Sequence, residues 1–251
     1  DNPRRGARRC GTAHLPGDRP YPGLMKITAI ILGGGAGKRV QGEIPKQFLP
    51  LDKRDKRPMI VHTVGAFQLA PSIDAIVVVV PQGWEQRCSD ELPSYHKVAG
   101  VITGGETRQL SCWQALQYLA ADPPHICVIH DAARPLVTGK MIEQAAREGE
   151  KGMTFGLPVT DTIVECRDGA ISTVLSREQL RQVQTPQAFP FQTLQEAHRQ
   201  ALEEGISDAS DDAGLVLRVG NRVQVIEGDP RNIKITGPAD LELARHLLLE
   251  G

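Results

Sequence analysis

The sequence predicts an α/β fold, in which a mostly parallel β-sheet is flanked by helices and one β-hairpin arm protrudes. Short apolar segments rich in β-branched residues alternate with longer segments of helical periodicity. That alternation is typical of βαβ units, which build parallel sheets. The hairpin is indicated by one stretch, residues 158–176, that breaks the alternation. The chain has 251 residues, enough for one α/β domain with a substantial core.

The first expected strand covers residues 27–32, with the sequence ITAIIL, and it runs into a glycine-rich loop. The loop glycines are Gly33, Gly34, Gly35 and Gly37. Glycine has no Cβ, so its backbone N–H groups can come close to a ligand. Cations follow at Lys38, Arg39 and Lys46. A donor-rich, cationic loop after a strand is a good place for a polyphosphate.

Two commoner glycine motifs do not fit this loop. The dinucleotide pattern G-x-G-x-x-G fails in both frames, because its last position falls on Lys38 or on Val40. The P-loop pattern fails because Lys38 is followed by Arg39 rather than by serine or threonine. A glycine-rich turn with a solvated basic rim is the alternative interpretation of this stretch.

The remaining elements follow in order from their periodicity. Strands are expected at residues 75–80, 98–102, 126–129, 154–157 and 223–226. Helices are expected at residues 59–70, 106–121, 141–148, 191–204 and 211–219. We expect a last helix that is capped by Thr236, with Pro238 and Asp240 in its first turn. The hairpin pairs residues 162–166 with 170–174 around an Asp-Gly turn.

Composition gives no indication of a nucleic-acid partner, a membrane span or a zinc site. There are 29 basic and 30 acidic residues, so the overall charge does not indicate a nucleic-acid partner. No apolar run is long enough to span a membrane. The five cysteines are scattered and the seven histidines lack zinc-ligand spacing, which is typical of a reducing, cytoplasmic setting. Residues 1–24 have no apolar periodicity, so we expect a disordered extension or expression remnant before a domain of residues 25–251.

Polar residues follow several of the expected parallel strands. Ligands of such sheets bind beyond the carboxyl ends of the strands, so these residues are candidates for one site. The candidates come from the segments at residues 104–108, 131–134 and 160–162, and from Lys234. Some neighbours have structural interpretations: His130 as a packed histidine, Asp211 and Asp212 as an acidic pair at a helix start, and Trp84 and Trp113 as core.

These residues carry a resemblance to a known family. The loop GGGAGKR with the following PKQF, at residues 33–39 and 45–48, resembles the signature of nucleotidyltransferases. The Pro-Lys-Gln form is similar to cytidylyltransferases of small polyol phosphates, most of all those acting on 2-C-methyl-D-erythritol 4-phosphate. The segments HDAARP at 130–135, QTPQAF at 184–189 and SDDA at 210–213 also match. The usual family loop begins Ala-Ala-Gly where this chain has Gly33, Gly34 and Gly35.

The resemblance implies a Rossmann-like nucleotidyltransferase fold and a role for each matching residue. Catalytic cations would be Arg39, Lys46, Arg177 and Lys234. The nucleotide would be bound by Gly33, Gly34, Gly35, Gly37, Gly105, Glu106, Ser111 and Ala132. The polyol phosphate would be bound by Asp131, Arg134, Thr162 and Thr185. Glu106 stands where the family often has aspartate.

The reaction implied is transfer of CMP from CTP to 2-C-methyl-D-erythritol 4-phosphate in non-mevalonate isoprenoid biosynthesis. Ribitol 5-phosphate or a related pentitol phosphate is the alternative acceptor, because both substrates are small polyols with one terminal phosphate. The resemblance also implies Mg²⁺ or another divalent cation, held mainly by the CTP phosphates with Asp131 as a candidate contact. It further implies a homodimer, whose arm brings Thr162, Arg177 and Thr185 to the acceptor across the interface.

Overall fold

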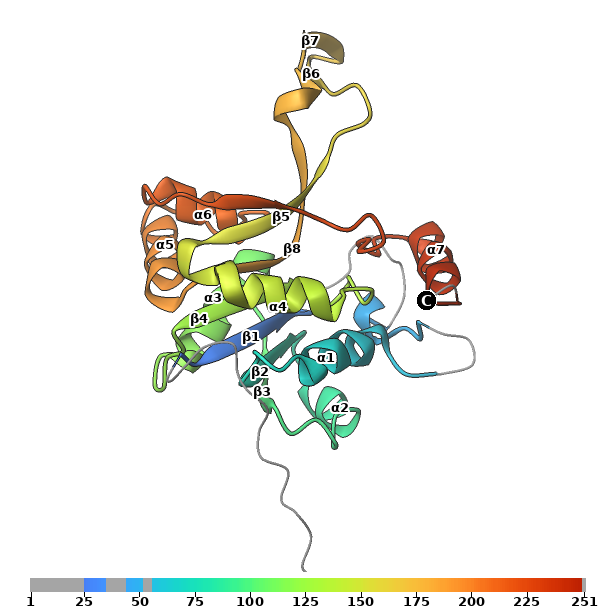
Figure 1. The fold of residues 1–251 in the computed structure, drawn as a ribbon, viewed down its shortest axis with the longest axis vertical. Helices are drawn as coiled ribbons and strands as arrows, with labels where there is room; N and C mark the ends of the chain where they lie inside the picture. The colour runs from blue at the N-terminus through green and yellow to red at the C-terminus, as the bar shows by residue number, and fades with distance from the viewer. Residues whose placement is uncertain (1–24, 35–43, 52–55, 250–251) are drawn as a thin grey trace, which may run out of the picture.

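The computed structural model describes residues 25–34, 44–51 and 56–249 of the chain (Figure 1). Four sequence expectations lie outside these residues: the character of residues 1–24 and the roles of Gly35, Gly37 and Arg39. No helix among the described residues combines the length and the apolar character that crossing a bilayer requires.

A seven-stranded sheet forms the centre of the molecule, in the order β3-β2-β1-β4-β8-β5-β9. Its strands are β1 (Ile27–Leu32), β2 (Ala75–Val80), β3 (Val98–Thr103), β4 (Ile126–Asp131), β5 (Met153–Pro158), β8 (Arg181–Pro190) and β9 (Gln224–Glu227). Neighbouring strands run parallel, except that β8 runs antiparallel to both β4 and β5. The prediction of a mostly parallel sheet is confirmed.

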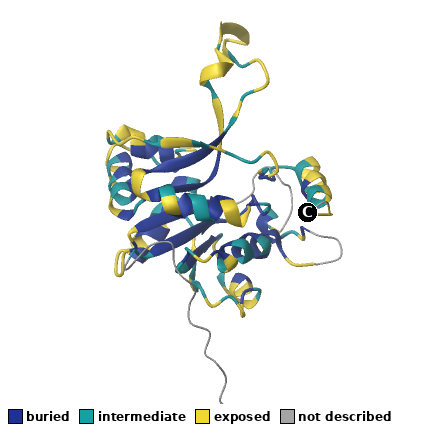
Figure 2. Cartoon of the chain, viewed as in Figure 1, coloured by how far each residue is buried: buried dark blue, intermediate teal, exposed yellow. Residues whose placement is uncertain are grey.

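Helices cover both faces of this sheet. The α-helices are α1 (Met59–Leu69), α2 (Glu85–Asp90), α3 (Arg108–Leu119), α4 (Gly139–Glu148), α5 (Phe191–Glu203), α6 (Asp212–Arg218) and α7 (Pro238–Leu249). Short 3₁₀ helices are η1 (Lys46–Phe48), η2 (Gly149–Lys151) and η3 (Arg177–Gln179). Alternate residues of β1 divide between two cores, since Ile31 packs with α1 and α4 while Ile30 packs with α3, α5 and α6. Both faces of the central strands are therefore buried (Figure 2).

Strand β8 was not predicted from the sequence. Its sequence, RQVQTPQAFP, contains two prolines and has neither an apolar run nor regular alternation. It nevertheless occupies a central position, where it is buried from Gln184 to Phe189. Its polar side chains are satisfied by tertiary partners: Gln187 donates to Thr154 Oγ1 (2.9 Å) and Gln184 to the Asp229 carbonyl (3.0 Å). Such partners cannot be inferred from local sequence.

The hairpin arm forms as expected, with β6 (Val164–Arg167) and β7 (Ala170–Val174) paired antiparallel in a sheet of their own. Asp168 (φ 50°) and Gly169 (φ 78°) make the turn, which requires positive φ at both positions. The arm projects well away from the main sheet (Figure 1), and most of it is exposed (Figure 2).

Several smaller expectations need correction. Trp84 and Trp113 are only half-buried at the edges of the cores rather than inside them. Asp240, rather than the expected Thr236, caps the last helix. Its carboxylate accepts hydrogen bonds from the Thr236 and Gly237 N–H groups (2.7 and 2.9 Å). An acidic side chain in the first turn can reach back to these free donors, as in a capping box.

Candidate active site

A hollow opens at the carboxyl ends of β1 and β4, beside the start of α3. Parallel α/β sheets place their ligands at this edge. Its wall comes from segments far apart in the chain: Leu32, Gly33, Gly34, Lys46, Gln47, Arg108, Ser111, Asp131, Ala133 and Lys234. Six of the expected site residues that the structure describes thus line one cavity: Gly33, Gly34, Lys46, Ser111, Asp131 and Lys234.

A second hollow shares part of this wall. It is lined by Arg108, Asp131, Arg134, Val183, Gln184, Thr185, Gln187, Ser210, Asp211 and Lys234. Arg108, Asp131 and Lys234 therefore stand between the two hollows. The first hollow contains the start of the glycine loop, and the second contains the expected acceptor residues Arg134 and Thr185. This division provides adjacent places for two anionic reactants.

The start of the glycine loop needs residues without a Cβ. A Cβ on Gly34 would lie 2.5 Å from Ser111 Oγ, and a Cβ on Gly33 would lie 3.0 Å from the Val79 carbonyl oxygen. The backbone of Gly33 is fixed by its N–H, which donates to that same carbonyl (2.8 Å). Ser111 Oγ in turn donates to the Thr107 carbonyl (2.8 Å). Gly34 thus lies closer to Ser111 of α3 than a residue with a side chain could.

The Pro-Lys-Gln segment after the loop is held from two sides. Lys46 Nζ donates to the Ile235 carbonyl at 2.9 Å, which ties η1 to the segment that carries Lys234. The amide of Gln47, which is 2% exposed, donates to the Gly33 carbonyl. Gln47 is a site residue to which the sequence analysis gave no role of its own. Its signal was its place inside the matching Pro-Lys-Gln motif.

Asp131, the last residue of β4, is surrounded by cations. Its Oδ2 lies 2.6 Å from Lys234 Nζ and 3.9 Å from Arg134 Nε, while its Oδ1 accepts from Arg108 Nε at 3.3 Å. Its backbone N–H donates to Thr185 Oγ1 (3.1 Å). Burial by itself would raise the pKa of Asp131, but Arg108 and Lys234 outweigh it and hold that pKa below its ordinary value. Asp131 is therefore an anion at neutral pH.

Arg134 lies in the turn after β4, fixed by its contacts. Its Nη1 donates to the Asn232 carbonyl (2.8 Å), and its own N–H donates to the Asp131 carbonyl (3.0 Å). Burial lowers the pKa of Arg134, and Asp131 opposes that shift.

His130 is fully buried, as expected, and its Nε2 lies 3.1 Å from the Arg134 carbonyl oxygen. Burial lowers the pKa of His130 to about 4. The neutral His130 thus donates to the turn that presents Arg134.

The other sequence candidates lie apart from the two hollows. Ala132 is buried, and its N–H donates to the Leu32 carbonyl (2.9 Å), so it joins β1 to the β4 end. Gly105 packs against Leu110, and Glu106 is exposed; neither lines either of the two hollows. Thr162 and Arg177 are exposed on the arm, where Arg177 Nη1 donates to the Thr160 carbonyl (2.8 Å). Within one chain the structure does not bring these two to the site.

Asp212 is more than the helix-end acid expected from the sequence. Asp211 alone caps α6, by accepting from the Gly214 N–H (3.1 Å). Asp212 is completely buried, with Oδ1 2.9 Å from His198 Nε2 and Oδ2 2.8 Å from Arg108 Nη1. Burial by itself would raise the pKa of Asp212, but Arg108 and His198 outweigh it and lower that pKa.

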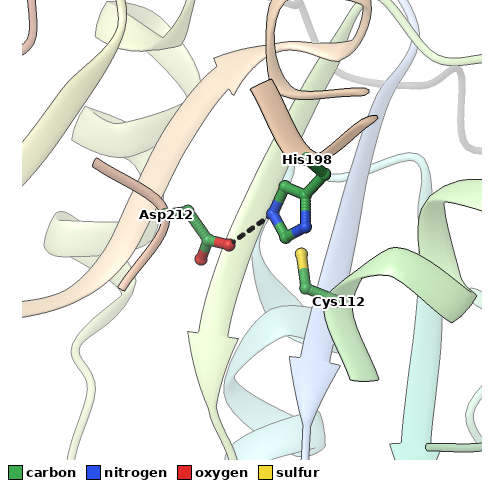
Figure 3. Close-up of side chains that lie close together, drawn as sticks. All are labelled: Cys112, His198 and Asp212. Atoms are coloured by element: carbon green, nitrogen blue, oxygen red, sulfur yellow. Dashed lines mark hydrogen bonds and ion pairs between the residues drawn. The ribbon is translucent and has the colours of Figure 1, made fainter. Parts of the chain in front are cut away.

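Cys112, His198 and Asp212 lie close together, and their potential ligand atoms are all within 4.8 Å of one another (Figure 3). The Asp212 carboxylate of this cluster already has protein partners. The second Asp212 oxygen is already paired with the Arg108 cation, and burial raises the pKa of the Cys112 thiol well above its usual value. Asp212 is thus satisfied by His198 and Arg108, and the Cys112 thiol is protonated in this arrangement.

Glycines after the first strand, together with cations gathered at the carboxyl edge of a mostly parallel sheet, are the arrangement expected of a nucleotidyltransferase. The sequence of residues 27–250 matches the family model of 2-C-methyl-D-erythritol 4-phosphate cytidylyltransferase. The chain belongs to this family.

Individual relatives agree with that assignment. A 2-C-methyl-D-erythritol 4-phosphate cytidylyltransferase of Syntrophotalea carbinolica is 39% identical, covering 89% of this chain and 97% of that protein. One from Geotalea uraniireducens is 36% identical over the same shares of the two chains. Among solved structures, the Thermus thermophilus enzyme of that name superposes with a TM-score of 0.71 at 33% identity, covering 90% of this chain and 100% of the other.

Proposed function

We propose that this protein transfers the cytidylyl group of CTP to 2-C-methyl-D-erythritol 4-phosphate and releases pyrophosphate. The observation that carries this proposal is the wall of Arg108, Asp131 and Lys234 between two hollows, in a chain of the matching family. The nucleotide would occupy the hollow that contains Gly33, Gly34 and Lys46. The polyol phosphate would occupy the hollow that contains Arg134 and Thr185.

The chemistry needs positioning and charge stabilisation rather than a protein nucleophile. An oxygen of the acceptor phosphate attacks the α-phosphorus of CTP, and the bond to the pyrophosphate oxygen breaks. Both reactants are anionic, so cations must bring them together and stabilise charge that moves toward the leaving group. Lys46 stands on the nucleotide side, and Lys234 stands where the two hollows meet. Asp131 holds the Lys234 ammonium in place through their 2.6 Å ion pair.

We also propose that Mg²⁺ or a similar cation takes part, bound by the phosphate oxygens of the nucleotide. When bound there, the metal would neutralise part of the triphosphate charge. Asp131 does not fit the role of a metal ligand, because its carboxylate already faces Arg108, Arg134 and Lys234. Because the triphosphate charge must be neutralised, we expect activity to depend on a divalent ion.

The arm supports the proposal of a homodimer. Ile171 and Val174 are 66% and 64% exposed on a hairpin that forms a sheet of its own, apart from the main sheet. An isolated hairpin is marginally stable, and exposed apolar side chains favour association. Thr162 and Arg177 sit on this arm, so they would serve the site of a second copy. A cytoplasmic location remains part of the same proposal.

Ribitol 5-phosphate is the less favoured acceptor, because the family model and the relatives named above are those of methylerythritol phosphate enzymes. The deciding experiment is pyrophosphate release with CTP and each of the two polyol phosphates, with and without a chelator. We expect turnover with methylerythritol phosphate and a divalent ion. Preference for ribitol 5-phosphate, equal turnover with ATP, or full activity in chelator would each overturn the corresponding part of the proposal.

A further inference from the structure

A line of buried charge runs from the shared wall of the two hollows into the helix layer behind it. Arg108, the first residue of α3, reaches two carboxylates from different elements. Its Nη1 lies 2.8 Å from Asp212 Oδ2, and its Nε donates to Asp131 Oδ1 at 3.3 Å. The remaining Asp212 oxygen accepts from His198 Nε2 at 2.9 Å. One guanidinium thus joins an active-site carboxylate to a fixed carboxylate in the interior.

The two carboxylates differ in what else they can contact. The Asp212 side chain has no exposed surface, so it cannot reach a ligand and serves only as an anchor. The Asp131 side chain is 9% exposed and lines both hollows. An arginine fork suits this bridge because its donors diverge in a fixed plane, whereas lysine is a single point charge. Exposed ion pairs contribute little, whereas removing one partner of a buried pair is costly because the other charge is left in the interior.

We propose that Arg108 is a positioning residue, which fixes the Asp131 carboxylate against buried Asp212 and, through Asp131, fixes the Lys234 ammonium between the two hollows. This inference rests on the proposed function. Without the bridge, Asp131 would keep its pairs with Lys234 and Arg134 but lose the link through α3 to the helix layer. The Lys234 side chain is 39% exposed, so its placement depends on the partner it pairs with.

A double-mutant cycle tests whether Arg108 acts through Asp131. The variants are Arg108→Gln, Asp131→Asn and the combination, each assayed for kcat/KM of pyrophosphate release with CTP and methylerythritol phosphate. Arg108→Gln alone should lower kcat/KM by about tenfold or more, as coupled active-site contacts do. In the Asp131→Asn background the same change should cost less than about twofold, because the group that Arg108 positions is already altered. A purely structural role, or direct contact of Arg108 with substrate, would give additive losses instead.

The matched control is Arg218→Gln, which removes an exposed ion pair of α6 with Glu204 (2.5 Å) and should leave the kinetics within about twofold of wild type. Since Arg108→Gln leaves the buried Asp212 carboxylate without its arginine partner, the cycle is repeated with Arg108→Gln/Asp212→Asn, which removes both charges. Additive losses, or near-wild-type activity of Arg108→Gln, would overturn the inference. So would failure of both Arg108 variants to fold, which assigns the residue to stability alone. An inactive wild-type protein would instead refute the proposed function.

Discussion

Lys46 shows how a single side chain in the site is supported by a distant part of the chain. Its ammonium donates to the Ile235 carbonyl at 2.9 Å, beside Lys234, and it lines the nucleotide hollow. A solvated rim cation would not be tied in this way. The sequence identified Lys46 through its motif, whereas its backbone partner became visible only in the structure.

Substituting Lys46 should therefore affect the transition state more than ground-state binding. Lys46→Ala should lower kcat by about a hundred- to a thousandfold, as loss of one preorganised charge donor typically does. Lys46→Arg should not restore full activity, because a planar fork does not replace a compact ammonium. Steady-state kinetics with both substrates measure this, and Lys151→Ala, at a position 72% exposed, is the control. A drop in kcat of less than tenfold would refute the catalytic assignment. The same expectation holds for Arg39, which lies outside the described residues.

His130 gives a prediction about pH and stability. Burial lowers its pKa to about 4, against an ordinary value of about 6.5, so the unfolded chain binds a proton that the folded chain does not. The free energy of unfolding should therefore decrease as pH falls from about 6.5 to about 4, and this contribution should be complete above that window. His130→Gln should flatten the dependence in denaturant titrations at several pH values. His96→Gln, at an exposed position, should leave it unchanged. Equal slopes for wild type and His130→Gln would contradict the assignment.

Helices and strands were predicted correctly from the sequence where a segment was strongly apolar or strongly periodic. The strand ITAIIL of β1 and the Asp168-Gly169 turn were both predictable, because each depends mainly on its own residues. Helix α2 was missed, since its six residues, EQRCSD, are almost all polar. Strand β8 was missed because its glutamines are satisfied by partners from other parts of the chain, on β5, on the loop at Asp229 and at the start of α6.

The arm can be tested as an element. Ile171→Asp combined with Val174→Asp places charge on two exposed apolar positions of the arm, and we expect the proposed dimer to dissociate into monomers with reduced activity. Light scattering at assay concentration measures the mass. Leu217→Asp makes the same kind of change at a 56% exposed position of α6 and should leave the dimer intact. A wild-type protein that is already monomeric and fully active would remove the arm from the proposed mechanism.

At the scale of the whole molecule, the site is assembled from both ends of the chain. The sequence predicted that Gly33, Gly34 and Asp131 would lie close together, because each follows or ends a parallel strand and such strands end at the same edge of the sheet. The structure places all three in one cavity. No local rule gives the strand order, and so the contact between Arg108 and Asp212 could not be foreseen. Thr162 and Arg177 were assigned by resemblance, and within one chain they remain distant from the hollows.

Helix α7 makes this long-range assembly testable away from the substrate. Arg245 donates from Nε to the Leu51 carbonyl (2.9 Å) and from Nη2 to the Pro50 carbonyl (3.1 Å), so α7 clamps the segment just after η1. Leu51 also packs in a small core with Ile235, the residue whose carbonyl holds Lys46. Loosening this clamp should misplace the Lys46 ammonium although nothing in the hollow itself has changed.

We therefore expect Arg245→Ala to reduce kcat/KM for CTP by about tenfold, since a small misplacement of a catalytic group is costly, while the thermal midpoint falls by only a few degrees. Glu242→Gln is the matched control, because it removes the ion pair of Arg245 with Glu242 (2.5 Å) while Arg245 keeps both bonds to the backbone carbonyls. That variant should retain wild-type kinetics, as exposed pairs contribute little. If Arg245→Ala and Glu242→Gln have equal kcat/KM, then α7 does not position Lys46, and the clamp serves stability only.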